Sequence, residues 1–128
     1  MNAPSRTGRP RPRFLDFARI RFPVGAVASI AHRISGVVLV AALPLGVLLL
    51  ERSLQADDAF PSLLRKAQSM PGRIALLLIA WAAAQHLFAG IRHLLMDVGI
   101  GSSLAAGRAS AYAVLAAAAL VSAASVLL

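Results

Sequence analysis

Residues 34–50, ISGVVLVAALPLGVLLL, contain no charged side chain. Two further uncharged runs follow, at residues 74–91 and 109–128. A helix needs roughly 20 apolar residues, within a range of about 17–25, to cross a hydrocarbon core of about 30 Å. Helices of water-soluble proteins seldom stay apolar on every side for so long. The sequence therefore predicts an all-α membrane protein with three transmembrane helices, over about residues 24–51, 73–98 and 107–128.

The composition is typical of a small membrane subunit. The chain has 128 residues, is 59% hydrophobic and contains no cysteine, which excludes disulfides, thiolate metal sites and covalent c-type haem attachment. Because lipid gives helices no hydrophobic drive to associate, a bundle of this size usually completes its packing with partner chains. The first apolar run is not expected to be a signal peptide, since about thirty polar and mixed residues precede it.

The basic residues are distributed unevenly along the chain. Nine of the thirteen Lys and Arg side chains precede the first run or flank the second connection: Arg6, Arg9, Arg11, Arg13, Arg19, Arg21, Arg33, Arg92 and Arg108. The other four lie in the first connection: Arg52, Arg65, Lys66 and Arg73. The positive-inside rule then places the N-terminus in the cytoplasm and the C-terminus in the periplasm. Despite a net charge of +8, we expect contacts with membrane lipid and partner subunits and no nucleic acid, because no aromatics are interleaved with the basic residues.

The chain divides into a cytoplasmic N-terminal segment, residues 1–23, and a membrane anchor domain, residues 24–128. Pro44 is expected to kink the first membrane helix. In the polar loop that follows, FPSLLRKAQ (60–68) predicts a short surface helix with Pro61 in its first turn.

Two of the predicted helices each carry polar residues and glycine on one face. On the second helix the members are offset by about 4, 7 and 11 residues and share a narrow face: His86, Gly90, His93 and Asp97. On the first helix the offsets are about 3, 4 and 7 residues: Ser29, His32, Arg33 and Gly36. Ionisable groups at this depth in a membrane almost always face a bundle interior or a cavity. We expect both stripes to do so.

The depth of each polar group follows from a rise of about 1.5 Å per residue, counted from the periplasmic ends of the helices. His86 lies roughly 18 Å from Ile74, inside the hydrocarbon. The other polar groups are expected one to three turns nearer the cytoplasmic interface. His32 would then be about 9 Å too shallow to oppose His86 across one iron.

A buried neutral histidine beside a glycine suits a haem iron, because imidazole is a common axial ligand. The alternative is that His86 hydrogen-bonds a neighbouring helix, and His32 and His93 would more often be hydrogen-bonded or solvated than ligands. His86 and His93 lie on the same side of one helix, so they cannot hold one iron from opposite faces. A six-coordinate haem would need its second ligand from another subunit.

Two blocks of the sequence resemble a known family. IRFPVGAVASIAHRISG (20–36) and HLFAGIRHLLMDVG (86–99) resemble the cytochrome b556 membrane-anchor subunit of succinate dehydrogenase, respiratory complex II. The family pattern is R-F-P…S-I-x-H-R-x-S-G at the start of the first helix and H-x-x-x-G-x-R-H-x-x-x-D on the second. Both patterns are present in order and at the right spacing. The resemblance covers about residues 9–128 and is specific in these two blocks.

The resemblance implies a three-helix chain that forms half of a haem-binding helical bundle in a bacterial inner membrane. It implies that His86 is an axial ligand of one haem b, with the opposing histidine on a second anchor subunit. Ser29 and Arg33 match residues that line the ubiquinone pocket beside the iron–sulfur subunit, in a complex that also contains a flavoprotein subunit. His32 and Arg33 also match positions near the haem propionates, and His93 and Asp97 match motif positions of less defined role. The tyrosine often found before the haem histidine is Gln85 here.

Chemistry of the same residues supports an electron-transfer subunit with no dehydrogenase chemistry of its own. A quinone site needs a hydroxyl or cationic donor near the interface, and Ser29 and Arg33 supply both. Quinone reduction consumes two protons, which Asp97 or His32 would relay. We also expect Arg33 and Asp97 to form an ion pair, since antiparallel helices bring them to similar depth.

Three alternative functions remain open from the sequence. One is the anchor of a fumarate reductase, although the S-I-x-H-R block favours the succinate-oxidising type. Another is a small proton-conducting transporter subunit that uses the polar stripe as its path. The third is a structural anchor that has lost haem, against which His86 argues.

Overall fold

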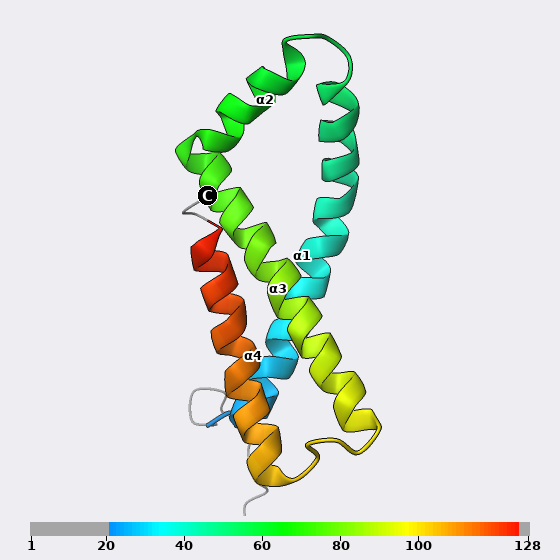
Figure 1. The fold of residues 1–128 in the computed structure, drawn as a ribbon, viewed down its shortest axis with the longest axis vertical. Coiled ribbons are helices and arrows are strands. Elements are labelled where there is room, and N and C mark those ends of the chain that lie inside the picture. Colours follow the sequence, from blue (N-terminus) through cyan, green and yellow to red (C-terminus); the bar gives the residue numbers. More distant parts are fainter. Residues whose placement is uncertain (1–20, 126–128) are drawn as a thin grey trace, which may run out of the picture.

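The fold is a bundle of helices, described by a computed structural model over residues 21–125. Within that range there are four helices and no strand: α1 (Val24–Ser53), α2 (Ala59–Gln68), α3 (Met70–Asp97) and α4 (Leu104–Ala124) (Figure 1). The predicted all-α class is therefore confirmed. Residues 1–20 and 126–128 lie outside the described range, so the N-terminal segment predicted for residues 1–23 falls almost wholly outside it.

The helix ends follow from local capping chemistry. α3 begins three residues earlier than predicted because Ser69 is its N-cap, with the Ser69 hydroxyl accepting a hydrogen bond from the Gly72 N–H at 3.4 Å. Pro71 fits within this first turn because its missing N–H would have no helical partner there. α4 likewise begins three residues earlier, with Ser103 as its N-cap. The short helix predicted at residues 60–68 is present as α2.

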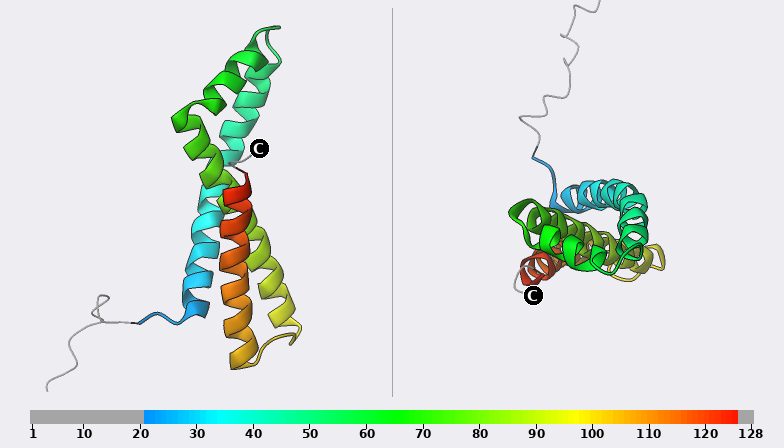
Figure 2. Two further views of the ribbon diagram at one scale, coloured as in Figure 1. Left: turned by 60° about the vertical axis from the view of Figure 1, so that its left-hand side comes forward. Right: turned by 90° about the horizontal axis from the view of Figure 1, so that it is seen from above.

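α1 continues without a break through Pro44, and it bends along its length (Figures 1 and 2). A proline inside a helix removes one backbone hydrogen bond and clashes with the preceding turn, so a bend is its expected effect. The C-terminal half of α1 diverges from α3, and α2 spans the distance between the two helices (Figure 1). Because α2 returns the chain along the bundle, α3 starts well below the C-terminal end of α1.

The core between α1, α3 and α4 consists of small side chains. Its apolar members are almost all alanine: Ala28, Ala82, Ala84, Ala89, Ala111, Val114 and Ala118. Small residues let helix backbones approach closely, which is how membrane helices commonly pack. Ser122 adds a hydrogen bond between helices, its hydroxyl donating to the Leu77 carbonyl at 3.1 Å. α3 is the central element, since it packs on both α1 and α4.

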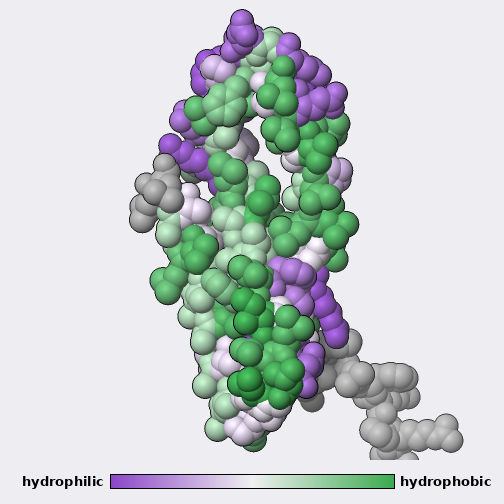
Figure 3. Space-filling view, turned by 45° about the vertical axis from the view of Figure 1, so that its right-hand side comes forward, coloured by the Kyte–Doolittle hydropathy of each residue, from purple (hydrophilic) through white to green (hydrophobic). Residues whose placement is uncertain are grey.

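The surface of the bundle is largely apolar. α1, α3 and α4 are each long and apolar enough to cross a membrane. Large hydrophobic side chains are exposed along them, such as Val37, Val40 and Leu43 of α1, each exposed over more than 70% of its area. Figure 3 shows this apolar surface, with hydrophilic residues gathered at the α2 end and in a patch lower on the bundle. The chain is a multi-pass membrane protein.

Candidate functional site

The three histidines of the chain meet where α1 crosses α3. The His32 ring of α1 stacks on the His86 ring of α3, with ring centroids 4.3 Å apart and an interplanar angle of 26°. The His93 ring of α3 also lies near the His32 ring, with ring centroids 5.1 Å apart and an interplanar angle of 40°. All three side chains are half-buried. The polar stripes of the two helices therefore face each other, as the helical spacing predicted.

Two glycines leave room for these rings. A Cβ atom at Gly36 would lie 3.0 Å from Cε1 and 3.3 Å from Nδ1 of His86, closer than carbon atoms normally approach. At Gly90 a Cβ would be 3.8 Å from Nε2 of His32, which is an ordinary contact. Gly36 is thus required by the position of the His86 ring, whereas Gly90 has some space to spare.

The Nδ1 atom of His86 lies against two oxygen atoms of α1. It is 3.2 Å from the backbone carbonyl oxygen of His32 and 3.4 Å from the hydroxyl oxygen of Ser35. The Ser35 hydroxyl in turn donates to the same His32 carbonyl at 2.8 Å. Ser35 has no exposed surface. One ring nitrogen of His86 is therefore anchored to α1, and the other is left for a further partner.

An apolar groove of about 590 Å³ opens beside these rings. Its lining residues come from α1 and from one histidine of α3: His32, Arg33, Gly36, Val37, Val40, Ala41 and His86. The α1 residues span two and a half turns, about 14 Å along the helix. The groove is polar at its Arg33 end and apolar at its Ala41 end. It suits a flat, mostly apolar ligand with polar groups at one end.

The predicted difference in depth between His32 and His86 is wrong. The sequence count placed His32 about 9 Å nearer the interface, but the two rings are stacked. The count assumed that Leu50 and Ile74 lie at one level. Since α2 returns the chain along the bundle, the start of α3 lies below the C-terminal end of α1 (Figure 1), and the two histidine rings come to the same level.

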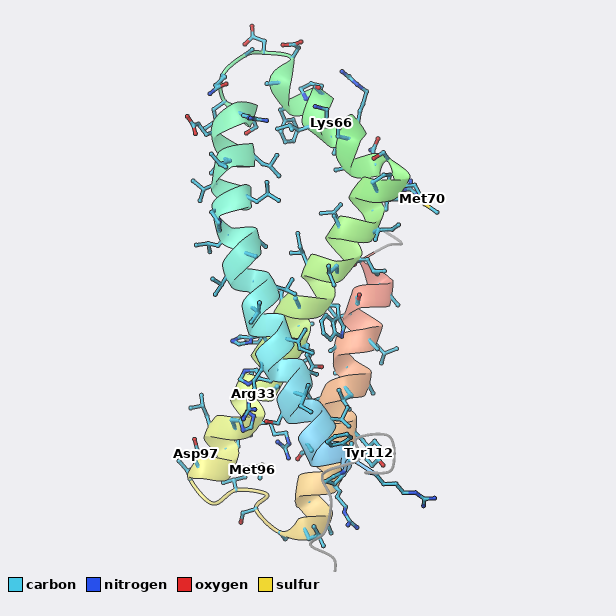
Figure 4. All side chains as sticks on the ribbon, turned by 180° about the vertical axis from the view of Figure 1, so that it is seen from behind. Arg33, Lys66, Met70, Met96, Asp97 and Tyr112 are labelled. Carbon is cyan, nitrogen blue, oxygen red and sulfur yellow. The ribbon has the colours of Figure 1, made fainter. Side chains whose placement is uncertain are left out.

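The ion pair predicted between Arg33 and Asp97 is also absent. No salt bridge within 4.0 Å joins them in the described structure, although both lie at the same end of the bundle (Figure 4). Both side chains are exposed, and Asp97 is the last residue of α3. Ser29 is half-buried on α1 and is not among the residues that line the groove. The structure thus groups Arg33 with His32 and His86, and leaves Ser29 and Asp97 at the margin.

Three further polar residues lie within or beside the two family blocks but were given no part in the site by sequence reasoning: Ser35, Gln85 and Arg92. Ser35 contacts both His32 and His86. The sequence feature that could have indicated it is a serine next to a glycine within an apolar helix. Arg92, counted only as a topology signal, ties α3 to α4: its Nε donates to the Ser110 hydroxyl at 3.0 Å and its Nη2 to a carbonyl of α4 at 3.1 Å. Gln85 is fully buried, and its amide nitrogen and oxygen have no hydrogen-bond partner within the described residues.

Metal binding by the histidines as a group is not supported by the geometry. Among residues 21–125, no cluster of three or more His, Cys, Asp or Glu side chains is arranged to hold a metal ion. The His32 and His86 rings are stacked, and the His93 ring is tilted by 40° to that of His32.

The chain has three apolar helices and a largely exposed apolar surface. These features define a small membrane subunit of the kind that packs against partner chains. The chain belongs to the family of succinate dehydrogenase/fumarate reductase transmembrane subunits, whose sequence profile matches residues 7–125. It is similar to a protein of Coxiella burnetii (strain RSA 493 / Nine Mile phase I) named succinate dehydrogenase cytochrome b556 subunit. The two are 42% identical over 105 residues, which cover 81% of this chain and 84% of the relative. A protein of the same name from Paracoccus denitrificans is 35% identical over 96 residues, covering 75% of this chain and 74% of that relative.

Proposed function

We propose that this chain is the haem- and quinone-binding anchor of a succinate dehydrogenase, passing electrons from an iron–sulfur subunit to ubiquinone. Family membership supports the coarser statement, a transmembrane subunit of succinate dehydrogenase or fumarate reductase. Both relatives carry the name succinate dehydrogenase cytochrome b556 subunit, which favours the succinate-oxidising type and a b-type haem. The observation that carries the haem assignment is the His86 ring in the wall of the groove, with its Nδ1 turned to a carbonyl.

The residues of the groove fit haem b at three points. A neutral imidazole whose Nδ1–H is bonded to a carbonyl keeps the Nε2 lone pair for a metal, as is usual for metal-ligating histidines. Gly36 gives the ring its space. Val37 and Val40 offer an apolar wall beside the cation of Arg33, which matches a macrocycle with carboxylates at one edge. When bound, haem b supplies a one-electron carrier whose potential depends on its axial ligands and their hydrogen bonds.

A second anchor subunit would supply the other axial histidine. His32 cannot do so from its place in the structure, because its ring is stacked on His86 at 4.3 Å and leaves no space for an iron between the two. His93 is excluded for a different reason: it lies two turns from His86 on the same face of α3, so the two rings cannot hold one iron from opposite sides. The haem would therefore be shared between two chains.

Ser29 and Arg33 are the proposed quinone-binding residues. They are four positions apart on α1 and share one face of the helix. A hydroxyl and a guanidinium are the donors that two quinone carbonyls require. His32, His93 and Asp97 are then candidates for contacts with the haem propionates or for proton relay to the quinone. Succinate oxidation itself would take place in the flavoprotein subunit, with no catalytic residue from this chain.

The proposed setting is a bacterial inner membrane with the N-terminus in the cytoplasm. The uneven distribution of basic residues supports this orientation through the positive-inside rule. It puts the histidine end of the bundle at the cytoplasmic side, where an iron–sulfur subunit can deliver electrons. The α2 end, with Arg65 and Lys66, would then face the periplasm.

The test is a reduced-minus-oxidised absorption spectrum of the purified complex. We expect b-type bands in the wild type, their loss in His86→Leu, and their retention in the control Leu94→Ala, which changes an exposed residue of the same helix outside the groove. Absence of the bands in the wild type would refute the haem assignment. Full haem content in His86→Leu would move the ligand to another residue.

A further inference from the structure

Ser35 belongs to a hydrogen-bond network that joins α1 to the His86 ring. The His32 carbonyl oxygen receives the Ser35 hydroxyl at 2.8 Å and lies 3.2 Å from Nδ1 of His86. The same hydroxyl oxygen is 3.4 Å from Nδ1. Ser35 is completely buried, so water does not compete for its hydrogen bonds. The His32 carbonyl oxygen, Ser35 Oγ and His86 Nδ1 form a closed triangle.

The chemistry of the triangle determines which nitrogen of His86 carries the proton. A neutral imidazole has one N–H donor and one lone-pair acceptor. A carbonyl oxygen only accepts, and the hydroxyl hydrogen of Ser35 is already directed to that carbonyl. Both neighbours of Nδ1 therefore present lone pairs to it, and the favourable arrangement has the proton on Nδ1. The lone pair is then on Nε2.

We propose that Ser35 is a positioning residue that sets the strength of the hydrogen bond that Nδ1–H of His86 donates to the His32 carbonyl of α1. The hydroxyl occupies part of the acceptor capacity of the His32 carbonyl and so limits how strongly that carbonyl draws on the Nδ1 proton. Gly36 and the His32 ring confine the imidazole from two other directions. Rotation of the ring is thus restricted, and Ser35 tunes the hydrogen bond at its Nδ1.

The consequence for a ligand on Nε2 rests on the proposed function. A stronger hydrogen bond at Nδ1 makes an imidazole a better electron donor to iron, since outer hydrogen bonds raise ligand basicity. Without the Ser35 hydroxyl the His32 carbonyl is free to accept more strongly from Nδ1. The oxidised iron would then be favoured, and the midpoint potential of the haem would fall.

A purely structural role for Ser35 is the competing explanation. Serine often bonds back to the carbonyl three or four residues earlier in membrane helices, with no function beyond satisfying its own hydroxyl. Ser122 provides the matched control, because it is also buried and also donates to a backbone carbonyl, that of Leu77 on α3. It is on α4, outside the histidine cluster. A structural effect would be shared by the two serines, whereas a positioning effect belongs to Ser35 alone.

The experiment compares Ser35→Ala, Ser35→Thr and Ser122→Ala in the whole purified complex. Potentiometric titration and the low-temperature EPR spectrum of the oxidised haem are measured. We expect a lower midpoint potential and altered g values in Ser35→Ala, recovery in Ser35→Thr, which keeps the hydroxyl, and wild-type values in Ser122→Ala. Loss of haem from Ser35→Ala would count against the proposal, because a stronger hydrogen bond at Nδ1 makes the imidazole a better ligand. Wild-type spectra and potential in Ser35→Ala, or an equal change in Ser122→Ala, would overturn it.

A second readout separates this inference from the proposed function. If the wild-type complex contains no haem, the proposed function fails, and the tautomer is still measurable in the full chain by NMR with ¹⁵N-labelled histidine. His86→Leu identifies the His86 signals by their disappearance. We expect a protonated Nδ1 and an unprotonated Nε2 in both the wild type and Ser35→Ala, with the Nδ1 resonance of Ser35→Ala shifted in the direction of a stronger hydrogen bond. Identical Nδ1 resonances in the two proteins, or a mixture of tautomers in the wild type, would refute the role of Ser35.

Discussion

Gly36→Ala tests the position of the His86 ring most directly, because it adds one methyl group at a known place. The new Cβ would lie 3.0 Å from Cε1 and 3.3 Å from Nδ1 of His86. Carbon atoms in contact prefer about 3.5–4.0 Å. The ring must therefore move by a few tenths of an ångström, or the helices must separate at their crossing. Either change displaces the proposed ligand nitrogen.

The size of the effect follows from the cost of overpacking. Adding a methyl group to a filled space typically costs about 1–3 kcal/mol. If this cost destabilises the haem-bound state relative to the haem-free state, haem affinity falls about 5- to 150-fold. Alanine also gains about 1 kcal/mol of helix propensity over glycine, which acts in the opposite direction. A control at another glycine of the same helix removes this second contribution.

Gly46→Ala is that control, since a Cβ at Gly46 has no other atom within 4 Å. The assay is the fraction of haem that each purified complex retains when challenged with apomyoglobin, followed by absorption. We expect Gly36→Ala to lose haem faster than both the wild type and Gly46→Ala. Equal retention by all three would show that the His86 ring does not lie against Gly36, and the haem geometry argued from that contact would fall with it.

Three further outcomes are expected from thermal unfolding of the purified protein. Arg92→Gln should lower the free energy of unfolding by about 1.5–3 kcal/mol, because charge-assisted hydrogen bonds between α3 and α4 disappear. Arg108→Gln, at an exposed site, should leave the free energy of unfolding unchanged. Gln85→Leu should be neutral or up to about 3 kcal/mol more stable, since it removes a buried amide without a partner among the described residues; a loss of stability would show that this amide is bonded in the assembled complex. Asp97→Asn should change stability by no more than about 0.5 kcal/mol, as the exposed carboxylate makes no salt bridge with Arg33; a larger loss would restore the predicted ion pair.

The fold was largely predictable because membrane helices are specified by length and hydrophobicity alone. Three uncharged runs predicted α1, α3 and α4, and only their ends differed from the structure by a few residues. Those ends depend on single capping residues, Ser69 and Ser103, whose effect is local. Hydrophobicity averaged over a whole span does not register them.

The relative depth of the two polar stripes was not predictable by counting residues. Counting requires a common reference level, and the connection between α1 and α3 contains a helix that changes this level. The face of each helix on which the histidines lie was predicted correctly, because it depends only on spacing within one helix. The position of these residues along the bundle was predicted wrongly, because it depends on the path of the connection between the helices. The stacking of His32 on His86 follows from that position.

Ser35 was missed for a related reason. Helical spacing from Ser29 and His32 directed attention to one face of α1, and Ser35 lies beside that face, between the two helices. Its importance arises from contact with a residue 51 positions later in the chain. A serine in an apolar helix is common enough that only the neighbour identifies its role.

The exposed valines of the groove show why the partner subunit is beyond the reach of this one sequence. Val37 and Val40 are more than 70% exposed in the isolated chain, like the residues that face lipid elsewhere on α1. A lipid tail, a haem edge and a partner helix all present apolar surface to such a side chain, so hydropathy does not distinguish them. The distinction comes from the polar atoms beside the valines. A lipid tail offers no partner to a histidine nitrogen and a guanidinium in one groove, whereas the proposed haem, shared with a second chain, would use both.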